Sequence, residues 1–260
     1  MSFDYKKSLG QNFLKDNNIV NKISNSINPN IDDLIIEIGP GAGALTSKLI
    51  NKGCDVICFE IDKRLEKELD KIKKDNLNIY FEDFLKVDIN NYIDINKYKR
   101  LFFVGNLPYY ITTAIINKIV DESNPYEIVI MIQKEVAERY MSKPNSKKYG
   151  SISVYLQYNF DITKICDVSR NCFEPIPKVD SIVIKLKKLN RKIKTNNEQL
   201  FYKLIKDSFK QKRKTLKNNL KTYNLKTIEE ILNKYNKTLN SRAEELEIEE
   251  FIDISNNINS

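Results

Sequence analysis

The sequence contains no histidine, and it has only four cysteines in 260 residues. The absence of histidine excludes imidazole bases, serine–histidine triads and histidine-ligated zinc. The cysteines form no Cys-x-x-Cys pair and are Cys54, Cys58, Cys166 and Cys172. This spacing favours reduced thiols packed in a core over a metal site or disulfides. We therefore expect a chemistry that requires no imidazole and no metal.

The chain also lacks any hydrophobic run long enough to span a membrane. Its N-terminal stretch, MSFDYKKSLGQNF, has none of the apolar character of a signal peptide. These features predict a cytoplasmic protein that does not associate with membranes. Hydrophobic residues make up 41% of the chain, which is enough for a substantial core. The length suits one large domain with a small companion.

Positive charge is concentrated in one part of the sequence. The net charge is +8, and the segment from Lys185 to Lys221 holds fourteen lysines and arginines against two acids, Glu198 and Asp207. The rest of the chain is therefore net negative. Such a concentration indicates a polyanionic partner such as nucleic acid. The alternative is a lysine-rich surface that is merely solvated.

Short apolar runs alternate with helical patterns along the first two thirds of the chain. The expected strands are 33–38, 55–60, 77–81, 100–105 and 127–132. The expected helices are 17–27, 43–52, 62–74, 112–121 and 134–142. Strands that are apolar on both faces and alternate with helices predict a doubly wound, mostly parallel α/β sheet. Ligands bind such sheets at the carboxyl ends of the strands.

The pattern changes after residue 150. SISVYLQYNF fits a helix or a strand, whereas TKICDV and DSIVIKLKKL indicate strands that extend the sheet. All later patterns are helical, at 197–209, 212–222, 226–235 and 245–257. We place a boundary at the polar stretch 190–197. The expected domains are thus 1–190, carrying the sheet, and 197–260, a small all-helical domain with much of the basic charge.

The first expected strand ends in a glycine-rich turn, Glu37-Ile-Gly39-Pro-Gly41-Ala-Gly43. Glycines let a backbone turn sharply and approach a ligand, and the following helix offers free N–H groups. Enzymes that bind NAD or FAD use similar turns, so a dehydrogenase is an alternative. Glu37 and Pro40 disfavour it, because an acid beside the turn suits a cationic cofactor better than a diphosphate.

Acids also follow the next two strands. Glu60 ends the second strand, where a carboxylate can accept both ribose hydroxyls, and Asp83 follows the third, where it could accept from an adenine amino group. The alternative for each acid is a helix cap or a solvated loop charge, which we expect for Asp62. Together the three acids describe an adenosine with a positive centre, S-adenosylmethionine.

These motifs resemble the rRNA adenine dimethyltransferase family. The resemblance includes Asn106-Leu-Pro-Tyr109 and extends from Lys7-Ser-Leu-Gly-Gln-Asn-Phe-Leu14 through QKEVAER, YGSISV and FEPIPKVDS to QKRKTL and RAEEL, nearly the whole chain. Its departures are small: Ala114 stands where proline is usual, and Lys212 where arginine is usual. The bacterial small-subunit branch is the most similar.

The resemblance implies a Rossmann-like class I methyltransferase fold with S-adenosylmethionine as cofactor. It implies dimethylation of two adjacent adenines in the 3′-terminal hairpin loop of small-subunit rRNA, within a pre-ribosomal particle, by a monomer. The expected cofactor contacts are Asn12 and Leu14 from the N-terminal arm, Gly39 at the turn, Glu60 on the ribose, Asp83 on the adenine and Asn106 beside the methyl group. Gly41 joins them through its place in the glycine turn.

The NLPY stretch offers the means to activate an amine without a base. Asn106 through its side-chain oxygen and Leu107 through its carbonyl could accept the N–H groups of the adenine amine and direct its lone pair toward the methyl group. Pro108 would hold the turn rigid. Tyr109 would stack on the extruded base, and Phe173 could close its other face. The alternative is a plain strand-to-helix turn; for Tyr110, simple packing is the alternative to a ligand contact.

The basic stretch KQKRKTLKNNL predicts a helix face against RNA phosphates, with Lys212, Arg213 and Lys214 as contacts. For Pro175, Pro177 and Asp180 a structural role is expected. Two alternatives to the small-subunit enzyme remain. One is a macrolide-resistance methyltransferase acting on large-subunit rRNA, and the other is a non-catalytic ribosome-assembly or transcription factor on the same fold.

Overall fold

A computed structural model describes residues 11–190 and 193–258. The chain forms two compact units. The sheet unit contains the chain up to Ala137 together with Ile162–Lys188, and the helical unit contains Glu138–Asp161 together with the chain from Leu189 onward. Each unit has its own buried hydrophobic core.

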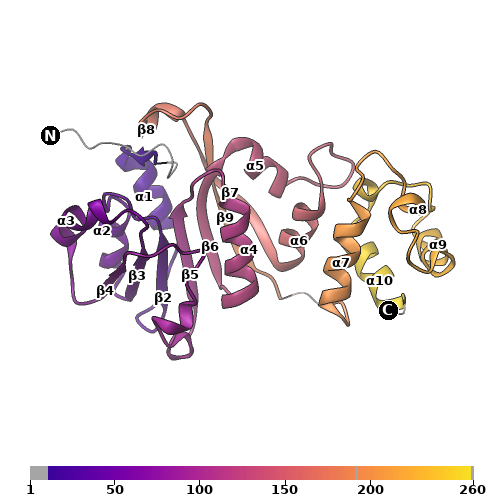
Figure 1. Ribbon diagram of the computed structural model, residues 1–260, viewed down its shortest axis with the longest axis horizontal. Coiled ribbons are helices and arrows are strands. Elements are labelled where there is room, and N and C mark those ends of the chain that lie inside the picture. The colour runs from indigo at the N-terminus through magenta and orange to yellow at the C-terminus, as the bar shows by residue number, and fades with distance from the viewer. Residues whose placement is uncertain (1–10, 191–192, 259–260) are drawn as a thin grey trace. The chain divides into compact units, whose positions relative to one another are not determined.

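The sheet unit is built on seven strands in the order β4-β3-β2-β5-β6-β9-β7 (Figure 1). In that order they are Leu77–Tyr80, Asp55–Phe59, Leu34–Ile38, Leu101–Asn106, Glu127–Gln133, Ser181–Lys188 and Phe160–Val168. Strands β2 to β6 pair in parallel, and β9 runs antiparallel to β6. The predicted α/β sheet and its extension after residue 160 are confirmed. The register sets Asn106, the last residue of β5, beside Met131, and β6 continues beyond this point to Gln133.

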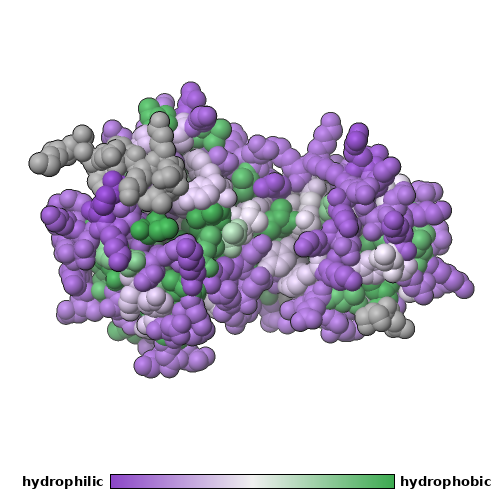
Figure 2. All heavy atoms as spheres, viewed as in Figure 1, coloured by the Kyte–Doolittle hydropathy of each residue, from purple (hydrophilic) through white to green (hydrophobic). Residues whose placement is uncertain are grey.

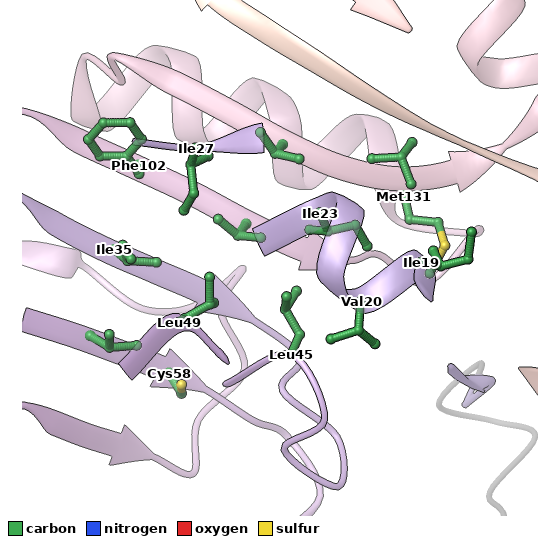
Figure 3. Packing of buried hydrophobic residues seen from close by; sticks show 14 of the residues in the cluster. Ile19, Val20, Ile23, Ile27, Ile35, Leu45, Leu49, Cys58, Phe102 and Met131 are labelled. Carbon is green, nitrogen blue, oxygen red and sulfur yellow. The ribbon is translucent and has the colours of Figure 1, made fainter. Parts of the chain in front are cut away.

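Helix α1, Asn17–Ser26, begins at Asp16, whose carboxylate accepts from the backbone N–H groups of Asn18 and Ile19. Ile19, Val20 and Ile23 are buried because they repeat at helical spacing on one face. Figure 3 shows these side chains directed toward the core that also contains Leu45 and Met131. Packing of this kind fixes the helix against the sheet.

The lengths of the other helices in this unit were predicted with unequal success. Helix α4, Thr112–Ser123, lies where expected, and so does α5, Lys134–Tyr140, of which only the part up to Ala137 belongs to this unit. The predicted helix 43–52 contains only α2, Thr46–Leu49, and a 3₁₀ turn, because Gly43 and Gly53 at its ends adopt left-handed φ angles of 82° and 86°. The predicted helix 62–74 likewise reduces to α3, Glu66–Leu69, with a 3₁₀ turn on each side.

A second, two-stranded sheet was not predicted. Strand β1, Phe13–Leu14, pairs antiparallel with β8, Phe173–Glu174. The backbone N–H of Lys15 also donates to the carbonyl of Cys172 at 2.8 Å. The N-terminal arm is therefore held by the segment that precedes β9.

The helical unit contains α6 to α10, which are Ser151–Asn159, Glu198–Ser208, Leu216–Asn219, Leu225–Lys234 and Ile248–Asn257. The ambiguous stretch SISVYLQYNF is a helix up to Asn159 and a strand from Phe160. Contacts place 138–161 in this unit rather than in the predicted sheet domain 1–190. The reason is that Val154 and Tyr158 of α6 are buried in the same core as Phe201 and Phe251.

The expected basic helix 212–222 is wrong in extent. Residues 209–215 form a turn, and only the four residues of α8 are α-helical. Backbone N–H groups of Leu216 and Lys217 donate to the carbonyls of Ser241 and Leu239, so this segment pairs with another loop instead of continuing a helix. The side chain of Asn219 completes the turn by donating to the carbonyl of Ser208 at 2.6 Å.

Hydrophilic side chains dominate the face shown in Figure 2. Within residues 11–190 and 193–258, no helix combines the length and apolar character needed to cross a membrane. All four cysteines carry free thiols; Cys54, Cys58 and Cys166 are buried as predicted, whereas Cys172 is only partly buried.

Candidate active site

A pocket opens at the carboxyl ends of β2, β3, β4 and β5. The residues predicted to contact a cofactor or to activate an amine all line it: Asn12, Leu14, Gly39, Gly41, Glu60, Asp83, Asn106, Leu107, Pro108 and Tyr109. The topology explains this gathering, because parallel strands end at one edge of the sheet. Segments almost a hundred residues apart in the sequence thus share one cavity.

The backbone of the turn after β2 favours glycine at positions 39 and 41. Gly39 and Gly41 adopt φ angles of 71° and 58°, which disfavour residues with a side chain. A Cβ atom on Gly41 would lie 2.8 Å from the ring of Phe13, whereas one on Gly39 would meet no atom within 4 Å. The arm therefore packs tightly on Gly41, and the space over Gly39 is left open for a ligand.

Glu60 holds the turn to the end of β3. Its Oε2 accepts from the backbone N–H of Gly41 at 3.0 Å, and its Oε1 accepts from that of Asp62 at 2.9 Å. The side chain is buried, and burial raises the pKa of its carboxyl group. Each carboxylate oxygen has a second lone pair available to a ligand donor. The neighbouring Asp62 caps the following turn, as expected, and accepts from Gln11 at 2.7 Å.

A second buried acid, Glu37, lies at the base of the pocket. Its side chain is fully enclosed, and burial raises its carboxyl pKa to about 7. The thiol of Cys58 donates to its Oε2 across 3.6 Å, and the negative charge of Glu60 reinforces the shift in pKa. Among the lining residues that the structure describes, there is no lysine or arginine. The pocket is thus lined by acids and suited to a cation.

Asp83 serves a local turn as well as lining the pocket. Its Oδ1 accepts from the backbone N–H of Leu85 at 3.1 Å, and its Oδ2 lies 3.8 Å from the Nζ of Lys86. Asp83 therefore closes a local turn and also lines the pocket, and its contact with adenine stays a prediction. Phe84 and Leu85 add apolar surface beside it.

The orientation of the Asn106 side chain follows from one hydrogen bond. Its amide nitrogen donates to the backbone carbonyl of Asn12 at 2.9 Å. Because an amide presents its oxygen opposite its nitrogen, Oδ1 is available as an acceptor. The backbone N–H of Leu107 donates to the backbone carbonyl of Met131 at 3.2 Å, and the carbonyl of Pro108 accepts from the backbone N–H of Ile111. In the described part of the chain, the carbonyl of Leu107 accepts no hydrogen bond.

The two tyrosines of the turn differ in environment. The hydroxyl of Tyr109 is hydrogen bonded to that of Ser181 at 2.9 Å, and the ring is half-buried, which raises the phenol pKa. Tyr110 also lines the pocket, yet 64% of it is exposed. The packing alternative for Tyr110 is therefore wrong.

The predicted RNA-contacting residues outside the turn are not part of the pocket. Phe173 is buried in the core and paired with Leu14, so this arrangement does not support its predicted contact with the base. Lys212, Arg213 and Lys214 are exposed on the turn of the helical unit. The ammonium of Lys212 donates to the backbone carbonyl of Lys147.

Sequence reasoning missed several lining or supporting residues: Gln11, Phe13, Ile61, Phe84 and Ser181. Gln11 and Phe13 flank Asn12 in the N-terminal motif, so adjacency could have indicated them. Ser181 follows directly after Asp180, in a segment expected to be structural. Its link to Tyr109 depends on β9 lying beside β6, which the sequence does not specify.

Comparison with solved structures places this architecture among Rossmann-like class I rRNA methyltransferases. A dimethyladenosine transferase from Plasmodium falciparum superposes with a TM-score of 0.77 at 26% identity, covering 93% of this chain and 95% of that one. The 23S rRNA methyltransferase ErmE superposes with a TM-score of 0.74 at 22% identity, covering 95% and 99%, which supports the fold alone.

Sequence comparison defines the group further. The profile of the ribosomal RNA adenine dimethylase family matches residues 2–260, so the chain belongs to that family, as predicted. Ribosomal RNA small subunit methyltransferase A of Aster yellows witches'-broom phytoplasma is 44% identical over 95% of this chain and 93% of its own length. The protein of the same name from Bacillus pumilus is 42% identical over 98% and 91%.

Proposed function

We propose that the protein uses S-adenosylmethionine to dimethylate the 6-amino groups of two adjacent adenines in the 3′-terminal hairpin loop of small-subunit rRNA, in an assembling small-subunit particle. The names of the full-length relatives support the small subunit over the large-subunit alternative. We also propose that it acts as a monomer.

The observation that carries the proposal is the orientation of Asn106. Its nitrogen is committed to Asn12, so its oxygen is presented as an acceptor at the end of β5. An adenine amine is a poor nucleophile because its lone pair is delocalised into the ring. Acceptance of its N–H groups by the Asn106 side chain and the Leu107 carbonyl would direct that lone pair out of the ring plane. Rate would then come from alignment rather than from a base.

The pocket fits the cofactor in three respects. The open space over Gly39 gives backbone access at the turn, and the remaining lone pairs of Glu60 suit the two ribose hydroxyls. Asp83, which also lines the pocket, would accept from the adenine amino group. When bound, the cofactor supplies an electrophilic methyl group on a sulfonium centre. Glu37, a buried acid of the pocket lining, would in its ionised form offset the positive charge of that centre.

Tyr109 would hold the target base. Its ring is fixed by the bond to Ser181, so the base would stack on a surface that is already ordered. The sequence predicted contacts between RNA phosphates and the exposed cations Lys212, Arg213 and Lys214 of the helical unit. The ammonium of Lys212 already donates a hydrogen bond to the backbone carbonyl of Lys147, so we propose that Lys212 stabilises that loop. We assign the phosphate contacts to Arg213 and Lys214.

Nucleoside analysis tests the proposed reaction. After incubation with methyl-labelled S-adenosylmethionine and small subunits that lack the modification, the rRNA is digested to nucleosides. We expect the label in N6,N6-dimethyladenosine. Label confined to another nucleoside would contradict the proposal, and Asn106→Ala serves as the control for contaminating activities.

A further inference from the structure

Tyr110 is an exposed aromatic residue within a binding pocket. Of its surface, 64% is accessible, although it lines the same cavity as Asn106 and Tyr109. Among the described residues, its hydroxyl makes no hydrogen bond, and no ring contact covers its face. Exposure of a large ring at a pocket is informative, because folding gains nothing from it there.

The turn nevertheless fixes where Tyr110 stands. The backbone N–H of Ile111 donates to the carbonyl of Pro108 at 3.2 Å, and the hydroxyl of Thr112 donates to the same carbonyl at 3.0 Å. These bonds close the chain around Tyr110 just before α4 begins. On the other side, Tyr109 is tied to Ser181. Tyr110 is thus an exposed side chain on a backbone that is held at both ends.

Within the described part of the chain, the two consecutive tyrosines therefore present one ring anchored by Ser181 and one exposed ring that has no such anchor. Their Cα atoms are about 3.8 Å apart, as in any trans peptide. Neighbouring nucleotides are also consecutive, and extrusion of one base removes a stacking partner from the next. An exposed ring beside the anchored one can replace that partner, and base–aromatic stacking contributes about 1–3 kcal/mol per base.

We propose that Tyr110 binds the nucleobase next to the target base by stacking, while Tyr109 holds the target. This inference rests on the proposed function and adds a second base subsite to it. The subsite would tolerate different bases, because every base offers a flat face. With two adjacent target adenines, either one occupies the Tyr110 subsite while the other lies beside Asn106.

Three variants of the full-length protein test the subsite on unmodified small subunits. Tyr110→Leu keeps an apolar side chain but removes the ring, Tyr110→Phe keeps the ring, and Tyr98→Leu makes the same change at a tyrosine of the sheet unit outside the pocket lining. KM for the subunits, kcat and the affinity for S-adenosylmethionine are measured for each, with thermal melting as a check on folding.

Tyr110→Leu is expected to raise KM for the subunits about tenfold, in line with the loss of one stacked base. Its cofactor affinity should stay unchanged, and Tyr110→Phe and Tyr98→Leu should both resemble the wild type. A normal KM for Tyr110→Leu overturns the subsite while leaving the proposed function intact. So does a loss confined to cofactor affinity, which would place Tyr110 in the cofactor site. If the wild type methylates no small-subunit adenine, both proposals fail.

Discussion

The side-chain nitrogen of Asn106 lies 2.9 Å from the backbone carbonyl oxygen of Asn12. This contact joins the end of β5 to the N-terminal arm, whose Phe13 packs on Gly41. The same arm is paired through β1 with β8. The N-terminal arm, which packs on the glycine turn, therefore also orients Asn106, the acceptor proposed for the adenine amine. We expect that order in the arm and the orientation of the Asn106 side chain depend on each other.

Replacement of Asn106 by alanine tests this arrangement. Asn106→Ala should lower kcat about a hundredfold or more, because alignment of the amine is lost. Cofactor affinity should weaken by no more than about tenfold, the value of a single hydrogen bond to the arm. Titration calorimetry and single-turnover kinetics separate the two effects. The matched control is Asn117→Ala in α4, outside the pocket lining; a large loss of cofactor binding with chemistry intact would reassign Asn106.

The bond between Tyr109 and Ser181 can be removed from either side. Ser181→Ala and Tyr109→Phe should each raise KM for RNA by about threefold to tenfold, since each leaves a stacking ring without its anchor. The double variant should be no worse than either single variant, because both delete the same bond. Ser123→Ala, which also removes a buried hydroxyl hydrogen bond of the sheet unit, is the control. Additive losses in the double variant would show that the two residues act separately.

Cofactor affinity should depend on pH through Glu37. Its raised pKa of about 7 means that the carboxyl binds a proton below that pH in the free protein. A sulfonium beside it favours the ionised form, so affinity for S-adenosylmethionine should rise by up to about tenfold per pH unit as the pH increases toward 7, and then level off. S-Adenosylhomocysteine, which lacks the cation, should not follow this curve. Parallel curves for the two ligands, or an unchanged curve in Glu37→Gln, would remove Glu37 from this role.

The basic turn of the helical unit should govern the salt dependence of RNA binding. Arg213→Gln together with Lys214→Gln should reduce the slope of log affinity against log salt by about 0.7–0.9 per cation removed. Lys212→Gln should instead lower the melting temperature, because its ammonium supports the Lys147 loop. Neutralisation of Lys67 and Lys73, exposed lysines of the sheet unit, provides the charge-matched control. An equal slope in the two double variants would move the RNA surface elsewhere.

The sequence predicted the strands closely because each is a short apolar run with a polar boundary. Residues 55–60 were expected and Asp55–Phe59 observed, and the acids at the strand ends gathered as parallel topology requires. The helix at 43–52 was predicted too long, because the spacing of apolar residues does not show that the glycines at its ends, Gly43 and Gly53, adopt left-handed φ angles.

The remaining features depend on contacts between distant segments. The bond between Asn106 and Asn12 and the bond between Tyr109 and Ser181 join residues 94 and 72 positions apart. No local pattern encodes such pairs. Residues 212–215 were predicted as the start of a helix, but they form a turn, and Leu216 and Lys217 pair with the loop at Leu239–Ser241. Local propensity gave way there to tertiary hydrogen bonding.

The most direct test of the proposed function compares the two ribosomal subunits as substrates. Each subunit is purified without the modification and incubated with the protein and methyl-labelled S-adenosylmethionine, and the methylated positions are mapped by mass spectrometry of RNA fragments. We predict label in the small subunit alone, as dimethylated adenines at two adjacent positions of the 3′-terminal hairpin loop. Label in the large subunit, or in neither, would contradict the account.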